Sequence, residues 1–540
     1  MAGARWWVVF MVGILGLAQA AMADAEFEAA QAAFEREDYK VAADLWEKAC
    51  NGGDGRACAR AGDLYSDGPG VANDDVRGAE FYRRGCVLKD GGACAALGYS
   101  YQKGEGLEAD LTKAAQFYIR SCDLGNATGC YDLGLLYDNG NGVPKDQARA
   151  AAFYRQGCDG GEESACFSLG LLYQDGSGVA ADPGRAAGLF RKSCDFGEHS
   201  ACGNLAYLYE TGTGVGKDPA RAAELYELAC DGRDYAFCGS LAGLYSDGLG
   251  VEKNPERAAR YYRRGCDGGS MSACVGLAIL YEDGKGVTKD AARAATLYRR
   301  ACDKDYALGC YNLALLYRAG TGVEKDNARA ARLYRKACTG GEAAACTNLG
   351  VLYESGIGVD IDPAEAVRFY TRGCDGANTL GCANLGSLYE EGKGVTKDLP
   401  RATALYTAAC DKGEGLGCHN LALLFDNGTG VAVDDARALV LYQKACTLGE
   451  ALACNNAGVM FDDGEGVAEN NPRAADLFRQ ACDGDNALGC TNLATLYENG
   501  EGVAKDTGKA LTLYRKTLTL DPEAKLRDKA VAAIERLSAK

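Results

Sequence analysis

The chain has 540 residues and a formal net charge of -17 at pH 7, because 75 Asp and Glu residues outnumber 58 Lys and Arg residues. Such an acidic surface repels nucleic acid and anionic lipid, so we expect neither as a partner. A chain of this length usually holds several domains. A strict internal repeat of 36 residues predicts one elongated array instead.

The N-terminal segment is typical of a secretory signal. Arg5 supplies the positive start, the run from Trp6 to Leu17 is apolar, and Ala21 and Ala23 form a small-residue cleavage site. A membrane anchor is the alternative, but the apolar run is too short to span a bilayer. We therefore predict a signal peptide over residues 1–23, no integral membrane segment in the mature chain, and a periplasmic or secreted location.

The two ends of the mature chain differ from its middle. Residues 24–50 look like a variant first repeat, in which the polar stretch EREDYK replaces a glycine turn. The period fails after Tyr514, and residues 516–540 are expected to form a final polar-faced helix. Solenoids need such ends to cover their terminal faces. We predict capping elements at 24–50 and 516–540, around a repeat array at 51–515.

Each repeat is predicted to be a helix-turn-helix. In the copy that starts at Cys166, Leu169, Leu172 and Tyr173 have helical spacing, and Gly176 ends the helix. The second helix begins in every copy after Asp or Asn, side chains that cap helix N-termini. These cap positions are Asp74, Asp110, Asp146, Asp182, Asp218, Asn254, Asp290, Asp326, Asp362, Asp398, Asp434, Asn470 and Asp506.

A Gly-x-Gly turn joins the two helices of each copy, as at Gly68 and Gly70, and is followed by Val or in one case Leu. Glycine adopts turn conformations that strain other residues. A phosphate-binding loop is the alternative, but it needs a preceding strand and usually a lysine. Aromatic residues also recur at one position of each helix, as at Tyr137 and Tyr154. This repetition indicates packing between hairpins rather than a cofactor site.

All 26 cysteines belong to 13 pairs with seven residues between their members. The gap spans the last turn of one helix, a bend and the first turn of the next, so the two Cα atoms can reach disulfide range. Zinc is the alternative, but two thiolates per pair and the two histidines of the chain cannot complete 13 sites. We predict disulfides, no metal, no cofactor and an oxidising compartment. The predicted pairs are Cys50 with Cys58, Cys86 with Cys94, Cys122 with Cys130, Cys158 with Cys166, Cys194 with Cys202, Cys230 with Cys238, Cys266 with Cys274, Cys302 with Cys310, Cys338 with Cys346, Cys374 with Cys382, Cys410 with Cys418, Cys446 with Cys454, and Cys482 with Cys490.

The motif Leu-Gly/Ala-x-Leu-Tyr-x-x-Gly-x-Gly-Val, then Asp-x-x-Arg-Ala, then Tyr-Arg-x-x-Cys, resembles the Sel1-like repeat. Residues 133–158 show it as LGLLYDNGNGVPKDQARAAAFYRQGC. The added cysteine pair is similar to that of the branch typified by the Helicobacter cysteine-rich proteins, and the resemblance covers residues 50–515. It implies an all-α, right-handed, TPR-like α/α solenoid of about 13 repeats with one disulfide each. It also implies a secreted or periplasmic adaptor that binds proteins or peptides, and members of this branch are described as weak penicillin-binding proteins and β-lactamases.

A serine β-lactamase needs a Ser-x-x-Lys motif with Ser-Asp-Asn-like and Lys-Thr-Gly-like elements. One Ser-x-x-Lys occurs, at Ser100 and Lys103, but Ser100 fills a slot that is Leu or Met in the other copies, and the other elements are missing. Two distant histidines cannot build a metallo-β-lactamase site. A Cys-His nucleophile at Cys418 and His419 would need a thiol that is predicted to be bridged. We therefore favour a non-enzyme, with Ser100 and Lys103 as the weak catalytic candidates.

The copies separate framework from variation without any alignment. Counted from the cysteine of the first helix, positions +3, +4, +6 and +7 are nearly fixed, whereas +1 and +5 vary and share one helical face. Variable aromatic residues occur there at Tyr131, Phe167, Tyr207 and Tyr311. Position +2 is Asn in seven copies, and an Asn can donate to and accept from a peptide backbone; capping a neighbouring loop or helix end explains it equally well. These residues are Asn204, Asn312, Asn348, Asn384, Asn420, Asn456 and Asn492.

Two functions follow from these observations. One is a scaffold that binds protein or peptide segments in the concave groove of the solenoid. The other is an enzyme that hydrolyses the β-lactam amide. An enzyme has one singular constellation, whereas a scaffold spreads its chemistry over many repeats, as this sequence does. We predict a monomeric scaffold with a protein or peptide ligand.

Overall fold

The computed structural model describes residues 22–520 and 523–539, and every regular element in those ranges is a helix. The predicted signal peptide falls on residues that lie outside this description, except Met22 and Ala23, which are the first described residues of a helix that continues to residue 35. Within the described ranges, no helix is both long and apolar enough to cross a membrane.

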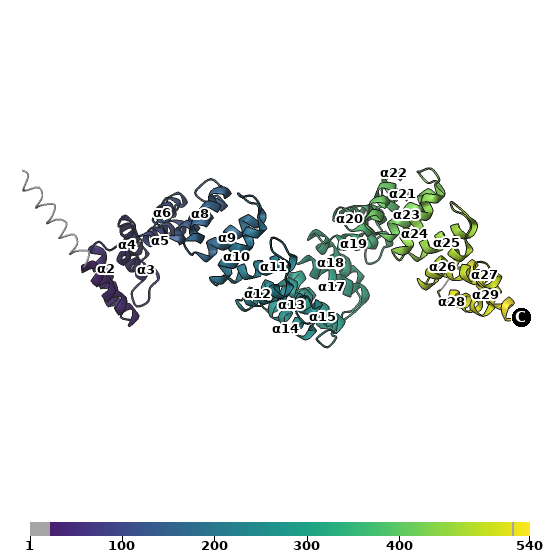
Figure 1. The fold of residues 1–540 in the computed structure, drawn as a ribbon, viewed down its shortest axis with the longest axis horizontal. Coiled ribbons are helices and arrows are strands. Elements are labelled where there is room, and N and C mark those ends of the chain that lie inside the picture. Colours follow the sequence, from purple (N-terminus) through teal and green to yellow (C-terminus); the bar gives the residue numbers. More distant parts are fainter. Residues whose placement is uncertain (1–21, 521–522, 540) are drawn as a thin grey trace, which may run out of the picture. The chain divides into compact units, whose positions relative to one another are not determined.

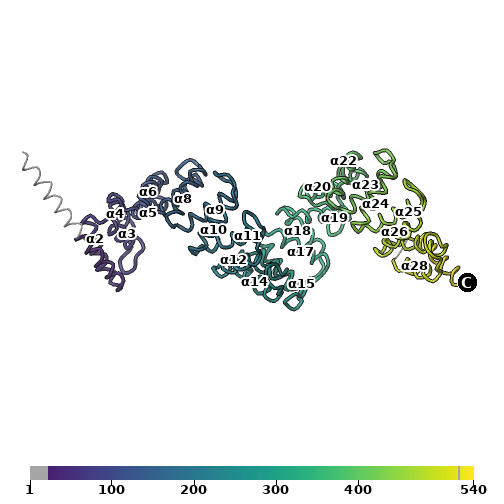
Figure 2. The backbone as a smooth tube through the Cα atoms, viewed as in Figure 1, coloured from purple at the N-terminus to yellow at the C-terminus, as the bar shows by residue number. Residues whose placement is uncertain are grey.

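Two units divide the chain, residues 1–270 and 271–540. In each unit, helix pairs follow one another along the chain (Figure 1), and the backbone repeats the same hairpin (Figure 2). We call the helix that starts each repeat helix A and its partner helix B. In unit 1 the A helices are α3 (Gly55–Asp67), α5 (Gly91–Lys103), α7 (Ala127–Asn139), α9 (Glu163–Asp175), α11 (His199–Thr211) and α13 (Tyr235–Asp247). Its B helices are α2 (Tyr39–Asn51), α4 (Asp75–Val87), α6 (Leu111–Asp123), α8 (Gln147–Asp159), α10 (Pro183–Asp195), α12 (Pro219–Asp231) and α14 (Pro255–Asp267).

Unit 2 continues the same alternation. Its A helices are α15 (Met271–Asp283), α17 (Ala307–Ala319), α19 (Ala343–Ser355), α21 (Thr379–Glu391), α23 (Gly415–Asn427), α25 (Ala451–Asp463) and α27 (Ala487–Asn499). Its B helices are α16 (Ala291–Asp303), α18 (Asn327–Thr339), α20 (Pro363–Asp375), α22 (Leu399–Asp411), α24 (Asp435–Thr447), α26 (Asn471–Asp483) and α28 (Thr507–Thr519), and α29 (Ala524–Ser538) follows them. The predicted α/α solenoid is confirmed.

The cap chemistry of the sequence sets the ends of the helices. Asp182 accepts a hydrogen bond at Oδ1 from the backbone N–H of Arg185, 3.0 Å away, and Pro183 occupies the first helical position. All thirteen predicted caps make such a bond in their own repeats. Gly176 ends the preceding helix with a φ of 71°, a left-handed conformation that suits glycine.

The second glycine of each turn has an additional role that the sequence did not reveal. A Cβ on Gly178 would lie 2.3 Å from the backbone carbonyl carbon of Gln147, at the start of helix B of the preceding repeat. Gly142 has the same relation to Leu111, at 2.5 Å. The turn therefore lies directly against the neighbouring hairpin, and glycine is needed for this approach as well as for its positive φ.

Aromatic side chains fill the layer between helices, as predicted. Helix B contributes a ring that is completely buried in many copies, as for Tyr118, Tyr370 and Tyr406, each 0% exposed. The arginine three residues after the helix B cap covers the aromatic ring of helix A. Arg185 lies 5.6 Å from the ring centroid of Tyr173 and donates to its hydroxyl at 3.3 Å.

Disulfides join each helix B to the next helix A. Twelve bonds connect cysteines that are eight positions apart, as in Cys338 with Cys346, and their Cα atoms lie 4.4–4.9 Å apart. Cys266 and Cys274 are disulfide-bonded as well, and the structure has no free cysteine in its described part. The disulfide prediction is confirmed.

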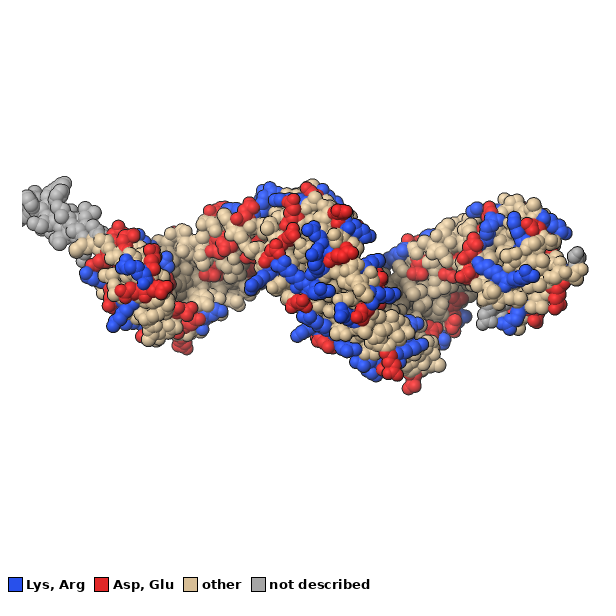
Figure 3. All heavy atoms as spheres, turned by 90° about the horizontal axis from the view of Figure 1, so that it is seen from below, with Lys and Arg blue, Asp and Glu red and all other residues tan. Residues whose placement is uncertain are grey.

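Consecutive A helices also contact each other directly, as α5 does with α3 and α7 in unit 1, and α21 does with α19 and α23 in unit 2. We call the surface that positions +1, +2 and +5 of the A helices contribute in each unit the A-helix face. On the face of the molecule shown in Figure 3, Lys and Arg side chains are interspersed with Asp and Glu.

Additional helices lie at both ends of the array. In residues 22–35, Ala30 and Ala33 are buried in one cluster with Trp46. At the other end, Ala530 and Leu537 of α29 are buried with Tyr514. The capping role of the two ends and its boundaries remain a prediction.

Candidate functional site

The A-helix face of unit 2 carries the asparagine series. Six of the seven predicted Asn residues lie on it at single-repeat intervals, and each is half-buried. They are Asn312, Asn348, Asn384, Asn420, Asn456 and Asn492. Asn204 has the equivalent place in unit 1 and is also half-buried.

A buried tyrosine lies next to these amides. The Tyr370 hydroxyl of α20 donates to Glu354 of α19 at 2.7 Å, and the Asn384 amide of α21 lies beside it. Burial raises the pKa of Tyr370, the Glu354 contact raises it further, and hydrogen bonding from Asn384 acts in the opposite direction. That sign is expected when the amide N–H donates to the phenol oxygen. Three consecutive helices thus bring together a carboxylate from α19, a tyrosine hydroxyl from α20 and the asparagine amide from α21.

The same chain recurs in the next two repeats. Tyr406 donates to Glu390 at 2.8 Å, and Asn420 interacts with the tyrosine. Tyr442 donates to Asp426 at 2.9 Å and interacts with Asn456 in the same way. The arrangement is a repeated unit of the fold.

The asparagine has another partner in repeats where the preceding helix B has phenylalanine in place of the tyrosine. Asn204 follows Phe190 and donates to the carbonyl of Ser200 in its own helix, at 2.8 Å. Asn492 follows Phe478 and donates to Oδ1 of Asn455, at 2.9 Å. The side-chain amide therefore has an intramolecular partner in both settings, although none of these partners is the neighbouring loop or helix end that the sequence suggested as the alternative.

The variable +1 aromatics are less available than their variability suggested. Three of the four predicted aromatic residues occupy +1, and each packs against the aromatic ring of helix B in its own repeat. These pairs are Tyr131 with Tyr154 at 5.9 Å between ring centroids, Phe167 with Phe190 at 5.8 Å, and Tyr311 with Tyr334 at 5.9 Å. Tyr207, at +5, is 52% exposed. Position +5 is the more accessible of the two.

The predicted catalytic candidates engage other groups. Ser100 is 5% exposed, and its Oγ donates to the carbonyl oxygen of Ala96, one turn back in α5, at 3.1 Å. The Lys103 Nζ lies 5.7 Å from the ring centroid of Tyr99. Nothing in this arrangement supports the β-lactamase alternative.

His419 also lies in the packed layer. It is 4% exposed, lies 5.6 Å from the ring of Tyr442, and burial lowers its pKa. Within the described residues, no group of three His, Cys, Asp or Glu side chains is placed to hold a metal ion.

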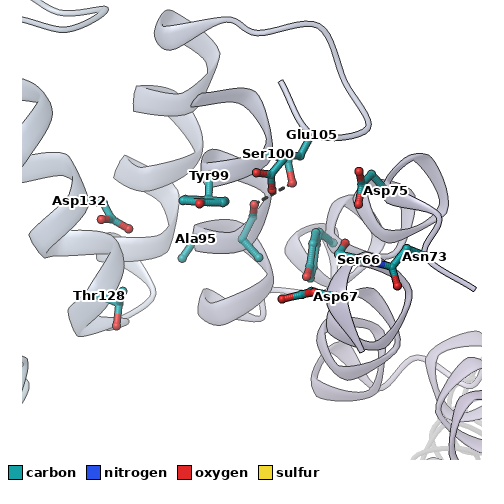
Figure 4. Close-up of a pocket in the computed structure, with 12 residues that line it drawn as sticks. Ser66, Asp67, Asn73, Asp75, Ala95, Tyr99, Ser100, Glu105, Thr128 and Asp132 are labelled. Atoms are coloured by element: carbon teal, nitrogen blue, oxygen red, sulfur yellow. Dashed lines mark hydrogen bonds between the residues drawn. The ribbon is translucent and has the colours of Figure 1, made fainter. Parts of the chain in front are cut away.

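A cavity of about 640 Å³ opens on the A-helix face near the N-terminus of unit 1. Helices α3, α4, α5 and α7 contribute its walls (Figure 4). The lining residues are Ser66, Asp67, Asn73, Asp75, Tyr82, Ala95, Ala96, Tyr99, Ser100, Glu105, Thr128 and Asp132. The sequence singled out only Ser100 among them. The useful signal was that Ser100 and Ala96 both depart from the common residue at their positions in the same copy.

Fourteen matches to the Sel1 repeat model cover residues 17–54, 55–86, 92–126, 127–162, 163–195, 199–234, 239–270, 272–306, 307–342, 343–378, 379–414, 415–450, 451–486 and 487–521. The chain belongs to the Sel1 repeat family. A search of curated proteins gives no match.

Among solved structures, the chain is similar to c5321, a protective antigen of uropathogenic Escherichia coli strains that displays an SLR fold. The identity is 26%, the TM-score is 0.57, and the match covers 86% of this chain and 94% of that one. A Sel1 repeat protein of Oxalobacter formigenes is 29% identical over 46% of this chain and 96% of its own, with a TM-score of 0.43. Cysteine-rich protein B of Helicobacter pylori is 30% identical over 25% of this chain and 98% of its own, with a TM-score of 0.22.

Proposed function

We propose that this Sel1 repeat protein is an exported scaffold that binds an extended protein or peptide segment along its A-helix face. Solenoids of Sel1 repeats are in general protein-interaction scaffolds. Export to the periplasm or beyond is supported by the disulfide in every repeat, because such bonds persist in oxidising compartments.

The observation that carries the proposal is the series of asparagines whose side-chain amides lie beside buried tyrosine hydroxyls. The amides of Asn384 and Asn420 each lie beside a tyrosine hydroxyl, and an amide that donates one N–H there keeps a second N–H and a carbonyl oxygen. Those remaining groups suit the alternating donors and acceptors of an extended backbone. An amide already fixed by the fold loses little side-chain entropy when a ligand binds.

The spacing of the series also suits an extended segment. Adjacent helix pairs lie about 10 Å apart, and an extended chain rises about 3.3 Å per residue. A bound segment would therefore meet one asparagine about every three residues. The variable +5 side chains, such as Leu315 and Leu423, would then contact its side chains between these points.

The test compares partner capture by wild type and by the fourfold variant Asn312→Ala, Asn348→Ala, Asn384→Ala and Asn420→Ala. Immobilised protein would be exposed to envelope and secreted proteins without reductant, and the affinity of the captured partner then measured. Each lost backbone contact is expected to cost roughly 1 kcal/mol, with disulfides and helicity unchanged.

The control carries Asn427→Ala and Asn499→Ala, two exposed asparagines at the ends of A helices. This variant should bind like wild type. Equal partner affinity for wild type and the fourfold variant would show that the asparagines are structural and that recognition lies elsewhere.

A further inference from the structure

The cavity near the start of unit 1 lies beside a repeat that departs from the common pattern at several positions. Ser100 stands where the other copies have Leu or Met, so a core-filling side chain is missing. Ala96 stands where most other copies have a polar side chain, and Ala95 where several have an aromatic ring. These three small residues line the cavity, whose volume of about 640 Å³ is within the usual size of a ligand site.

The preceding turn also differs from the others. Gly68, which ends α3, has a φ of -84° and a ψ of 154°, whereas its counterpart Gly104 is left-handed at 78°. Pro69 follows Gly68, and a residue before proline favours an extended conformation. The chain therefore leaves α3 in another direction before it reaches Asn73 and Asp75, which line the cavity.

Acidic side chains surround the space. Asp67, Asp75, Glu105 and Asp132 all line it, and none of the residues described as lining it is Lys or Arg. In Figure 4, Asp132 and Asp75 lie on opposite sides, with Glu105 near Ser100 between them. Unpaired carboxylates around one cavity repel each other, and a cation that enters it relieves that repulsion.

One of these carboxylates lacks the partner that the fold supplies at its position in other repeats. Asp132 occupies the asparagine position +2, but the neighbouring hydroxyl of Tyr118 donates to Gln102 instead, at 2.8 Å. No described residue forms a hydrogen bond or ion pair with the half-buried Asp132 carboxylate, and burial raises its pKa to about 6. Ser100 is 5% exposed, and its Oγ donates to the carbonyl oxygen of Ala96, so it can offer an incoming donor only its acceptor lone pairs.

We propose that this cavity binds the guanidinium group of an arginine in the partner segment. The proposal rests on the function inferred above, since the cavity opens on the A-helix face. A guanidinium presents five N–H donors in a plane, which match carboxylates on several sides and the Ser100 oxygen. Arginine is also more weakly hydrated than lysine, so it is the cation better suited to a half-buried site.

The wall chemistry favours an organic cation over a metal ion. The acidic groups are not grouped closely enough to hold a metal, as noted for the described residues. Tyr99, 46% exposed, supplies an aromatic wall, and Lys103 lies over its ring at 5.7 Å without lining the cavity. A ring of this kind can stack with a guanidinium plane.

The test uses the full mature chain and three synthetic peptides. The first is N-acetylated, C-amidated Gly-Ser-Gly-Arg-Gly-Ser-Gly; the second replaces arginine by citrulline, which has nearly the same shape and no charge; the third has lysine. Calorimetry at pH 7.5 and low salt should show at least tenfold tighter binding of the arginine peptide than of the citrulline peptide, with the lysine peptide between them.

Two variants restore residues that other repeats already accommodate, so both are expected to fold. Asp132→Asn removes the unpaired charge, and Ser100→Leu fills the cavity. Each should abolish the preference for arginine over citrulline, whereas the control Asp175→Asn, an exposed residue outside the cavity, should retain it.

Equal affinity for arginine and citrulline peptides, or absence of binding to all three up to 5 mM, would overturn the proposal. A preference that persists in both variants would overturn it too, because the cation would bind elsewhere. Tighter binding of lysine would refute the guanidinium assignment. None of these results bears on partner capture by the asparagine series in unit 2, so failure here is distinguishable from failure of the proposed function.

Discussion

Asn492 donates a hydrogen bond from Nδ2 to Oδ1 of Asn455 in the preceding repeat, over 2.9 Å. Asn455 in turn donates to Oδ1 of Asn456, at 3.3 Å. The amides at this end of the asparagine series therefore bond to each other rather than to a tyrosine alone. The series therefore has amides beside tyrosine hydroxyls and a terminal amide, Asn492, that bonds to another asparagine, and Asn456 has a partner of each kind.

These different partners predict different effects of mutation. Asn455→Ala removes an acceptor for Asn492 and a donor for Asn456, so the free energy of local opening of α25 and α27 should fall by roughly 1 kcal/mol. Hydrogen–deuterium exchange of those helices would measure the loss. Partner affinity should remain within twofold of wild type, in contrast to the fourfold variant of Asn312, Asn348, Asn384 and Asn420. A large loss of affinity in Asn455→Ala would instead place the ligand over the C-terminal repeats.

The disulfides predict a simple pattern of linked peptides. Proteolysis without reductant, followed by mass spectrometry, should give 13 local links and no free thiol in the mature protein. Removal of one bond by Cys374→Ser and Cys382→Ser should lower the local free energy of opening by roughly 2.5 kcal/mol, the loop-closure value for so short a loop. Exchange protection should fall in α20 and α21 and remain in distant repeats, because repeats contact only neighbours. A major link between Cys58 and Cys86 would contradict the assignment.

Sequence alone predicted the features that depend on local chemistry. Caps such as Asp182 and the left-handed glycine at Gly176 follow from residues within one hairpin, and each cysteine pair follows from two helices that are consecutive in the chain. The buried aromatic layer followed from strict repetition, since a residue present in every copy has a structural role. These features need no knowledge of how hairpins meet.

Features that depend on contacts between hairpins could not be predicted in the same way. Tyr131 and Tyr311 have helical spacing that places them on a surface, but the adjacent helix B ring covers them. The close approach of Gly178 to Gln147 joins residues 31 positions apart through the geometry of stacking. The cavity depends on Ser100 and Asp132 from different repeats, whose proximity only the stacking of hairpins establishes.

Gly178, in the turn before α10, and Gly188, within α10, have different surroundings. Substitution by alanine is therefore expected to change stability in opposite directions at the two positions. Gly178→Ala places a Cβ 2.3 Å from a backbone carbon at a φ of +70°, so local stability should fall by roughly 2 kcal/mol or more. Gly188→Ala adds a Cβ with no heavy atom within 4 Å in a helix interior, so stability should rise by roughly 0.5–1 kcal/mol. Urea denaturation of both variants would show the two signs, and equal effects would refute the packing role of the turn.

Ser100 allows a direct test of the enzymatic alternative. Its hydroxyl donates to a helix carbonyl, and the Lys103 ammonium lies over Tyr99, so neither is arranged to activate the other. We predict no nitrocefin turnover above trace level for the purified mature protein. Robust hydrolysis that Ser100→Ala abolishes and Lys103→Ala reduces would overturn this prediction.

Asp132 predicts a pH dependence of local stability. Burial, with a smaller contribution from Glu162, raises the pKa of its carboxyl to about 6, against about 3.9 in an unfolded chain. Between these values the folded state binds the proton more tightly than the unfolded state. The free energy of opening of α7 should therefore fall as pH rises from about 4 to about 7, and the total loss is roughly 1–3 kcal/mol.

Asp132→Asn lacks this titration and gives the matched comparison. Exchange protection of α7, converted to a free energy of opening at each pH, should show the variant more stable than wild type at pH 7. The two should converge near pH 4, where the wild-type carboxyl is protonated in the folded state. Asp63 also has a pKa raised by burial, but its carboxylate receives the Tyr82 hydroxyl, so both proteins retain its contribution and the difference isolates Asp132. A stability difference that is constant with pH would show that Asp132 is well solvated. The ionised Asp132 carboxylate would then not lower the free energy of opening of α7.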